Sequence, residues 1–273
     1  MFVALSTDRN SKSTIMLKRI IKNFNSLFVL IVTLAMHSAC SDGGVGSGET
    51  YGTLYDSRDG KTYRTVTIGS QTWMAENLNF EMAKSYCYAD EPYYCSKYGR
   101  LYLWSAAMDS IGMFSDNGKG CGHCWGSKCC APVYPVRGAC PEGWHLPSKE
   151  EYATLIEFVG GVQNPEETYV TEYGWTYSEY LYAGKYLKSS TGWIAHSGTD
   201  SYGFSAFPSG MFFGAKQEGY DYLGKSAQFF TSSHDGYAGN VVAVDLWSND
   251  DEIAINGDTV NDLDGYSVRC VKD

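Results

Sequence analysis

The chain has 273 residues, a length that fits one large domain or two small ones. It holds 21 Lys and Arg against 31 Asp and Glu, and residues 1–40 contribute five of the basic and one of the acidic residues. Without that segment the chain would keep 16 basic and 30 acidic residues. A surface this acidic repels nucleic acid and anionic lipid head groups, which excludes both as expected partners.

The N-terminal segment has the three parts of a signal peptide. Basic residues at 18, 19 and 22 precede an apolar run over 27–36, and two small residues then precede Cys40. A run of this length is too short to cross a bilayer core of ~30 Å as a helix. Because Met16 directly precedes the basic residues, we expect translation to start there rather than at Met1.

Cys40 ends a segment that resembles a lipobox, in which the cysteine becomes the lipidated first residue of the mature protein. His37 stands where such boxes usually carry leucine, so ordinary cleavage beside an unmodified cysteine is the alternative. Ser41, rather than aspartate, after the cysteine favours sorting to the outer membrane. We therefore expect an exported protein, attached to the outer membrane or cell surface by its lipid.

Residues 41–54 are rich in glycine and serine and are predicted to form a flexible tether, which leaves residues 55–273 as one folded domain. Nine cysteines less Cys40 leave an even number, which in an oxidising compartment predicts disulfides. Cys87 and Cys95, eight residues apart, form a natural local pair. The other six are Cys121, Cys124, Cys129, Cys130, Cys140 and Cys270.

The first predicted element is a hairpin. Two β-favouring runs, residues 64–68 and 71–74, are joined by Gly69 and Ser70, a pair suited to a type II′ turn. Residues 101–108, LYLWSAAM, are interpreted as a buried helix, although their periodicity is ambiguous.

A helix is predicted from Ser148, which with Glu151 three residues later forms a capping box. Apolar residues then follow at helical spacing, and a Gly-Gly pair at 160–161 ends the helix. The apolar stripe consists of Tyr152, Leu155, Ile156 and Val159.

The later part of the chain is rich in aromatic residues, serine and glycine, in short runs separated by turn signals. These runs predict strands or extended segments at 201–213, 228–232, 241–247 and 265–271. Helices early and strands late indicate an α+β domain with much irregular loop, rather than alternating βαβ units.

Six segments in order resemble the Fibrobacter succinogenes major paralogous domain, found in exported and often lipid-anchored bacterial proteins. They are DGKTYRTVTIGSQTWMAENLNF (59–80), KYGRLYLWSAAM (97–108), CPEGWHLPSKEEYATL (140–155), GKYLKSSTGW (184–193), GTDSYGFSAFPSG (198–210) and GYSVRCVKD (265–273). The resemblance covers residues 55–273 and implies export.

Some of these segments are also distantly similar to formylglycine-generating, sulfatase-modifying proteins. That similarity implies a loop-rich, disulfide-stabilised, C-type-lectin-like fold whose terminal strand pairs beside the first. His145 stands where those proteins usually have arginine, so the similarity implies the fold and not the activity. A bridge from Cys140 to Cys270 would clamp such a core and close a loop of about 130 residues, which loop-entropy models credit with roughly 4–5 kcal/mol.

The sharpest chemical pattern is Cys121-x2-Cys124-x4-Cys129-Cys130, with His123 inside it. We expect structural disulfides, because the protein is exported and a second well-spaced ligand pair is missing. A zinc site and a C-x-x-C redox site are the alternatives.

Residues 247–252, WSNDDE, resemble the segment that supplies calcium ligands in lectins of this architecture. Asn249 and Asp250, followed by two further carboxylates, would suit calcium. Ser248 interrupts the motif and no partner motif occurs upstream, so a solvated acidic loop is the expectation and no cofactor is assigned.

Two groups of aromatic residues differ in their expected role. The tryptophans at 73, 104, 144 and 193 lie in the family-like segments and are expected in the core. Trp125, Trp175 and Tyr177 lie in variable loops, with Tyr180 and Tyr182 close by, and flat rings there could stack on sugar faces. Ordinary loop packing is the alternative for any one of them.

No catalytic set stands out. The histidines are scattered, and a bridged Cys270 would leave no cysteine nucleophile in the late part of the domain. We therefore predict a non-catalytic, surface-anchored binding domain, with polysaccharide as the leading ligand class. The alternatives are a formylglycine-generating type of enzyme, which needs a free Cys270, and a structural protein of the cell envelope.

Overall fold

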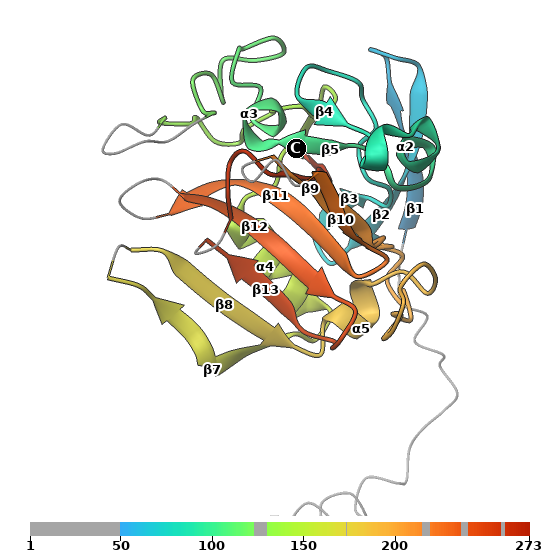
Figure 1. The fold of residues 1–273 in the computed structure, drawn as a ribbon, viewed down its shortest axis with the longest axis vertical. Coiled ribbons are helices and arrows are strands. Elements are labelled where there is room, and N and C mark those ends of the chain that lie inside the picture. The colour runs from blue at the N-terminus through green and yellow to red at the C-terminus, as the bar shows by residue number, and fades with distance from the viewer. Residues whose placement is uncertain (1–49, 123–129, 173, 215–218, 236–239, 258–259) are drawn as a thin grey trace, which may run out of the picture. The chain divides into compact units, whose positions relative to one another are not determined.

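Two sheets carry the fold, one built mainly from early residues and one mainly from late residues (Figure 1). The computed structural model describes residues 50–122, 130–172, 174–214, 219–235, 240–257 and 260–273. These residues form one strand-rich α+β domain. No helix in the described ranges is both long and apolar enough to cross a membrane.

The five-stranded sheet has the order β1-β2-β3-β15-β6. Its strands are β1 (Thr50–Asp56), β2 (Lys61–Ile68), β3 (Gln71–Met74), β15 (Val271–Lys272) and β6 (Trp144–His145). The predicted hairpin is present, with Ile68 opposite Gln71 and a φ of +60° at Gly69. Residues 50–54, expected in the tether, belong to β1, because they pair antiparallel with β2, from Thr50 opposite Thr67 to Leu54 opposite Tyr63.

The ten-stranded sheet follows the path β10-β9-β14-β11-β12-β13-β8-β7, and β5 joins β4 to β14. The path strands are β10 (Gly219–Leu223), β9 (Ser209–Phe213), β14 (Gly265–Ser267), β11 (Ser226–Asp235), β12 (Asn240–Trp247), β13 (Ile253–Asn256), β8 (Thr176–Leu181) and β7 (Val162–Val170). The two short strands are β4 (Ser85–Tyr86) and β5 (Leu101–Leu103).

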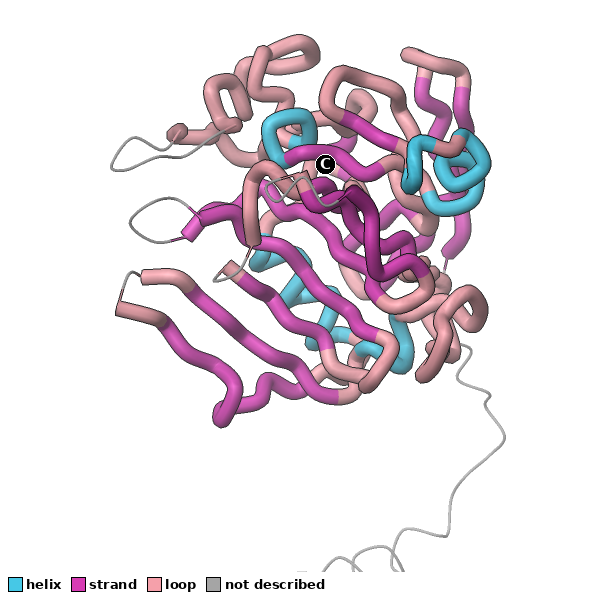
Figure 2. The backbone as a smooth tube through the Cα atoms, viewed as in Figure 1, coloured by secondary structure: helices cyan, strands magenta, loops and turns pink. Residues whose placement is uncertain are grey.

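The helices are short and lie between strands (Figure 2). They are the 3-10 turn η1 (Tyr88–Asp90), α2 (Pro92–Tyr98), α3 (Trp104–Ala107), α4 (Lys149–Phe158) and α5 (Gly184–Leu187). The prediction for α4 is confirmed, because Ser148 and Glu151 cap it reciprocally. The helix expected over 101–108 is wrong in its first half, since Leu101 and Leu103 pair with β14 and only four residues become helical.

The late strands are placed partly as expected. The strands predicted at 228–232 and 241–247 fall within β11 and β12, and the segment 265–271 divides into β14 and the start of β15. The segment 201–213 is a strand only from Ser209. Its first part turns back on itself, because Asp200 accepts hydrogen bonds from the backbone N–H and the hydroxyl of Ser205.

Helix α4 packs against one face of the ten-stranded sheet, behind β12 and β13 in Figure 1. Tyr152, Leu155 and Ile156 of the helix share a core with apolar residues of those strands. The opposite face of the sheet contributes to a second core, which also holds the expected tryptophans Trp104 and Trp144.

The described residues form three disulfides: Cys87–Cys95, Cys121–Cys130 and Cys140–Cys270. The first and third are the pairs expected from the sequence, whereas Cys124 and Cys129, together with His123, lie outside the described residues. Three disulfides indicate a protein of an oxidising, extracytoplasmic compartment.

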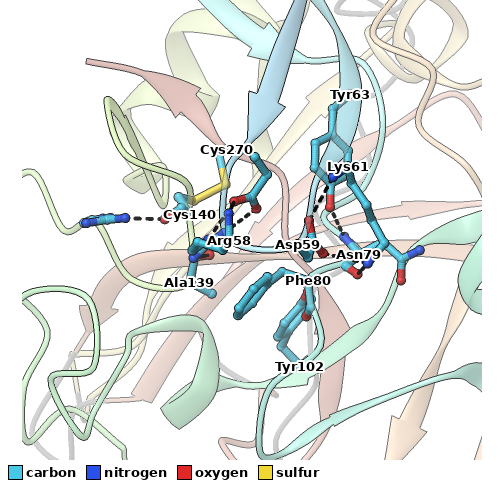
Figure 3. Close-up of polar contacts among 12 residues, drawn as sticks. Arg58, Asp59, Lys61, Tyr63, Asn79, Phe80, Tyr102, Ala139, Cys140 and Cys270 are labelled. Atoms are coloured by element: carbon cyan, nitrogen blue, oxygen red, sulfur yellow. Dashed lines mark hydrogen bonds and ion pairs between the residues drawn. A yellow bond between two sulfur atoms is a disulfide. The ribbon is translucent and has the colours of Figure 1, made fainter.

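Arg58 reinforces the region around Cys140, as Figure 3 shows. Its guanidinium forms two hydrogen bonds with the carboxylate of Asp56, at 2.9 and 2.7 Å, and a third with the carbonyl of Ala139 at 2.9 Å. The same group lies 4.0 Å above the ring of Phe80. The turn after β1 is thereby attached to the residue that precedes the Cys140–Cys270 disulfide.

Arg269 is fully buried and has no carboxylate partner among the described residues. Its guanidinium donates to the side-chain oxygen of Asn77 and to the carbonyls of Phe204 and Ser205. It also lies 4.5 Å from the centre of the Phe204 ring. Burial lowers the pKa of Arg269 to about 10, so the group stays charged at neutral pH.

Replacing Arg269 should destabilise the domain strongly. Arg269→Met keeps an apolar stem but leaves two buried carbonyls and an amide oxygen without donors, and we expect a loss of roughly 3 kcal/mol in the free energy of unfolding. Denaturant unfolding measures this. Arg64→Met, at an exposed ion pair with Glu76, is the control and should change little; equal stability of the two variants would contradict the prediction.

Candidate functional site

The strands of the larger sheet alternate between residues that face α4 and residues that face away from it. Val244 and Leu246 of β12 point toward α4 with Ile253 and Ile255 of β13. Asp245 lies between Val244 and Leu246, so its side chain projects from the opposite face. The residues beside it on neighbouring strands are polar or small, and together they form a pocket.

This pocket, called the sheet-face pocket below, has a volume of about 220 Å³. Strands β8, β11, β12, β13 and β14 contribute to it, with the loop that leads from β12 to β13. Its lining residues are Tyr177, Glu179, Gln228, Asp245, Trp247, Asp250, Glu252, Ala254, Asn256, Val260 and Tyr266.

One row of side chains across four strands forms the floor of the pocket. Gln228 is opposite Asp245, Asp245 is opposite Ala254, and Ala254 is opposite Glu179. Neighbouring strands lie about 4.8 Å apart, so the backbones at Asp245 and Glu179 are separated by roughly 10 Å. The methyl group of Ala254 leaves the space between these two acids open.

Asp245 is the most perturbed acid of the pocket. Burial raises its pKa to about 6, although the neighbouring amides of Asn256 and Gln228 oppose the shift. Asn256 donates to Oδ2 of Asp245 at 3.1 Å. Oδ1 of Asp245 and Oε1 of Gln228 are both buried, and neither has a hydrogen-bond partner within the described ranges.

Two further carboxylates lie at the β8 side of the pocket. Oε1 of Glu179 accepts a hydrogen bond from Asn164 at 2.7 Å. The pKa of Glu252 is raised by burial and by the negative charges of Glu179 and Asp250. The pocket therefore concentrates negative charge that is only partly relieved by hydrogen bonds.

Three aromatic side chains line the same space. Tyr177 stacks on Tyr169 with ring centres 5.2 Å apart, and Tyr266 stacks on Phe230 at 4.7 Å. Trp247 meets Tyr222 edge to face. Burial raises the pKa of Tyr177 to about 12, so its hydroxyl keeps its proton and can donate as well as accept.

The loop over 247–252, weighed above as a calcium site, is held by a lysine. The ammonium of Lys188 donates to the carbonyls of His196, Trp247 and Asp250, and lies 3.5 Å from the carboxylate of Asp251. Lys188 is fully buried, and burial lowers its pKa.

Neither calcium candidate adds to a metal site. Asn249 is exposed, and Asp250 lines the sheet-face pocket. The described part of the chain holds no group of three His, Cys, Asp or Glu side chains placed to bind a metal ion.

The other sequence candidates are placed as follows. Tyr177 lines the pocket, whereas Trp175 lies just before β8, where its backbone N–H donates to the hydroxyl of Thr171. Tyr180 lies in the core and Tyr182 is exposed. Trp125 lies outside the described residues.

Sequence reasoning missed Asp245 and Gln228. Both stand inside strands whose neighbours are apolar, as in VVAVDLW over 241–247. A single acidic residue in an apolar run could have pointed to this site, because charged residues are rarely buried without a partner. The residues that stand opposite Asp245 depend on the strand register, which cannot be read from the sequence.

A larger pocket of about 610 Å³ lies at the start of α4, and most of its charged groups are paired with one another. His145 contacts Glu151 at 2.8 Å and Asp273 at 2.7 Å, and Lys149 contacts Asp235 at 2.6 Å. Burial opposes charging of His145, yet these carboxylates raise its pKa overall. The larger pocket also holds one buried unpartnered oxygen, Oγ of Ser232, but the sheet-face pocket combines two such oxygens with three aromatic rings and is the better candidate for a ligand.

Comparison with protein-family models matches residues 66–272 to the Fibrobacter succinogenes major domain. Comparison with curated proteins finds no significant match, and neither does comparison with solved structures. Cys270, the nucleophile required by the enzyme alternative, is bonded to Cys140.

Replacing Asp245 by asparagine should stabilise the domain at neutral pH. The pKa of Asp245 rises from 3.8 to about 6 on folding, so its stabilising contribution is present below pH 3.8 and is lost as the pH rises through 6. Ionisation at pH 7 then costs roughly 3 kcal/mol, which Asp245→Asn avoids. The thermal unfolding temperature of Asp245→Asn should be higher than that of the unmodified protein at pH 7, and the two should converge near pH 3.8. A variant that is less stable at pH 7 would contradict this account.

Proposed function

The chain belongs to the Fibrobacter succinogenes major domain family, and from that premise we propose that it is an exported, non-catalytic domain that binds polysaccharide. The sheet-face pocket is the proposed binding site. One observation carries the proposal: aromatic rings and buried hydrogen-bonding groups that lack partners line the same small space.

Sugars need both kinds of contact at once. The C–H face of a sugar ring packs on an aromatic side chain, while its hydroxyls require donors and acceptors at the ring edge. Tyr177, Trp247 and Tyr266 offer rings. Asp245 and Gln228 offer acceptors that no described protein group uses.

The cellular setting fits such a role. Lipid attached at Cys40 would hold the protein at the outer membrane or cell surface, and the segment from residue 41 to β1 would act as the tether. The three disulfides are compatible with that exposure. A domain anchored there would meet polysaccharide outside the cell.

A C-type-lectin-like architecture is proposed for the domain on topological grounds. Val271 of β15 pairs with Trp73 of β3, so a late strand lies beside the first hairpin. The Cys140–Cys270 disulfide joins the same late strand to the segment before α4. The first feature is what the distant similarity implies for this fold, and the second is the bridge expected to clamp such a core.

Two other functions stay as alternatives. An enzyme of the formylglycine-generating type would need a thiol at Cys270, which the Cys140–Cys270 bond occupies. A structural envelope protein would need no ligand, and its pocket would tolerate substitution. A binding experiment separates the proposal from both.

Substitution of the pocket should weaken glycan binding without unfolding the domain. Full-length protein is tested against soluble and insoluble polysaccharides, with and without calcium. Tyr177→Ala removes a stacking ring, worth about 1 kcal/mol or more, and Ala254→Leu fills the floor between the two acids without changing charge. Both should weaken binding about fivefold or more.

Tyr93→Ala is the matched control, because Tyr93 is an exposed tyrosine on α2 outside the pocket. It should bind as the unmodified protein does. Binding that survives both pocket variants, or the absence of binding to every glycan, would overturn the proposed function.

A further inference from the structure

The sheet-face pocket is negatively charged along its whole lining. Four carboxylates line it, from Glu179, Asp245, Asp250 and Glu252. Among the described lining residues there is no lysine, arginine or histidine. A ligand with a negative charge would therefore be repelled at this site, and a neutral ligand would leave the charge unbalanced.

The nearest cations are already engaged elsewhere. Lys188 lies under the loop before β13, where its ammonium is enclosed by three carbonyls and the Asp251 carboxylate. Lys225 lies over the ring of Tyr222, 5.9 Å from its centre, and is not part of the lining. Neither lysine reaches the row formed by Asp245, Ala254 and Glu179.

The unsatisfied atoms of the pocket are of one kind. Oδ1 of Asp245 and Oε1 of Gln228 are oxygen acceptors, and these side chains are only 6 % and 5 % exposed. Buried acceptors without donors are costly, so a ligand that brings N–H or O–H groups would gain by filling them. An ammonium group supplies three donors and a charge that matches the carboxylates.

The aromatic lining also favours a cation. Rings of tyrosine and tryptophan attract positive charge to their faces, and they do so more strongly when water is excluded. Tyr177, Trp247 and Tyr266 stand around the same space as the carboxylates. Rings beside carboxylates form a site suited to an organic ammonium.

The pocket volume limits the size of the ligand group. A volume of about 220 Å³ lies below the roughly 300–1,000 Å³ of pockets that hold drug-sized ligands, so the pocket suits one small group. The distance of roughly 10 Å between the backbones that carry the two facing acids leaves room for one ring rather than a long chain. A sugar ring with an amino substituent meets the requirements for size, stacking and donors together.

We infer that the sheet-face pocket selects a sugar unit that carries a free, protonated amine, in preference to neutral, N-acetylated or acidic sugars. This inference rests on the proposed polysaccharide-binding function and names its ligand class. The amine would lie between Asp245 and Glu179 over Ala254, and the ring would pack on Tyr177.

The pH dependence of binding follows from the groups that face Asp245. Glu179 and Tyr177 face it from β8, Tyr266 from β14, and Asp250 and Glu252 from the loop before β13; the amides are Gln228 on β11 and Asn256 on β13. Because the pKa of Asp245 is about 6, its charge develops between about pH 5 and about pH 7. Affinity for an amino sugar should rise over that range, whereas affinity for a neutral sugar should not.

The test uses full-length protein and titration calorimetry with glucosamine, N-acetylglucosamine and glucose, and with their short oligomers. Glucosamine should bind about tenfold or more tightly than the other two, as expected for a charge-assisted hydrogen bond in a buried site. Affinity for glucosamine should also be higher at about pH 6.5 than at about pH 4.5, where Asp245 is protonated. Added salt should weaken it.

Asp245→Asn should lose that preference while the domain stays folded, as its unfolding curve will report. Glu157→Gln is the charge-matched control, because Glu157 lies on α4 at the other face of the sheet. Glu157→Gln should keep the full preference. A preference that Asp245→Asn retains would overturn the assignment of the amine to this carboxylate.

The remaining outcomes separate the inference from the function on which it rests. Equal binding of glucose and glucosamine overturns the amine selectivity but leaves polysaccharide binding intact. The absence of binding to any sugar overturns the proposed function. If α-N-acetyl-lysine amide binds as tightly as glucosamine, the site recognises ammonium groups in general and the assignment to a sugar is overturned.

Discussion

The buried guanidinium of Arg269 connects segments that are far apart in the chain. It donates to Asn77 after β3 and to the carbonyls of residues 204 and 205 before β9. Asn77 in turn donates to Ser267 of β14 and to the carbonyl of Tyr98. The two sheets thus share one polar network inside an apolar core, and neither can shift without leaving a buried charge or carbonyl unsatisfied.

Local chemistry made some elements predictable, and pairing in three dimensions decided the others. The capping box at Ser148 and the turn at Gly69 are each formed by a few neighbouring residues. Helix α4 and the first hairpin could therefore be predicted from the sequence. Strand β7 could not, because its sequence VQNPEETYV is polar and mostly exposed and it is held as an edge strand by β8 alone. Residues 101–103 are compatible with a helix when considered alone, but they form a strand because they pair with β14.

Single residues of the candidate site were predicted from the sequence, but nothing in the sequence indicated that they share one pocket. Tyr177 was a candidate sugar-stacking ring, and Asp250 was weighed as a calcium ligand although a solvated acidic loop was the expectation; both line one pocket. Asp245, which links them, was missed because its partners are set by the register of four strands. The same strands that face α4 with valine, leucine and isoleucine face the pocket with acids and amides, so one sheet supplies both stability and recognition.

The position of β15 has a consequence for the order in which the protein can be made. Residues 265–273 supply Arg269, the Cys270 bridge and the strand inserted between β3 and β6. Until these residues have been synthesised, the earlier hairpin lacks its neighbour and Cys140 lacks its partner. The core therefore cannot close without that segment, because the five-stranded sheet, the Arg269 network and the Cys140–Cys270 disulfide all depend on it.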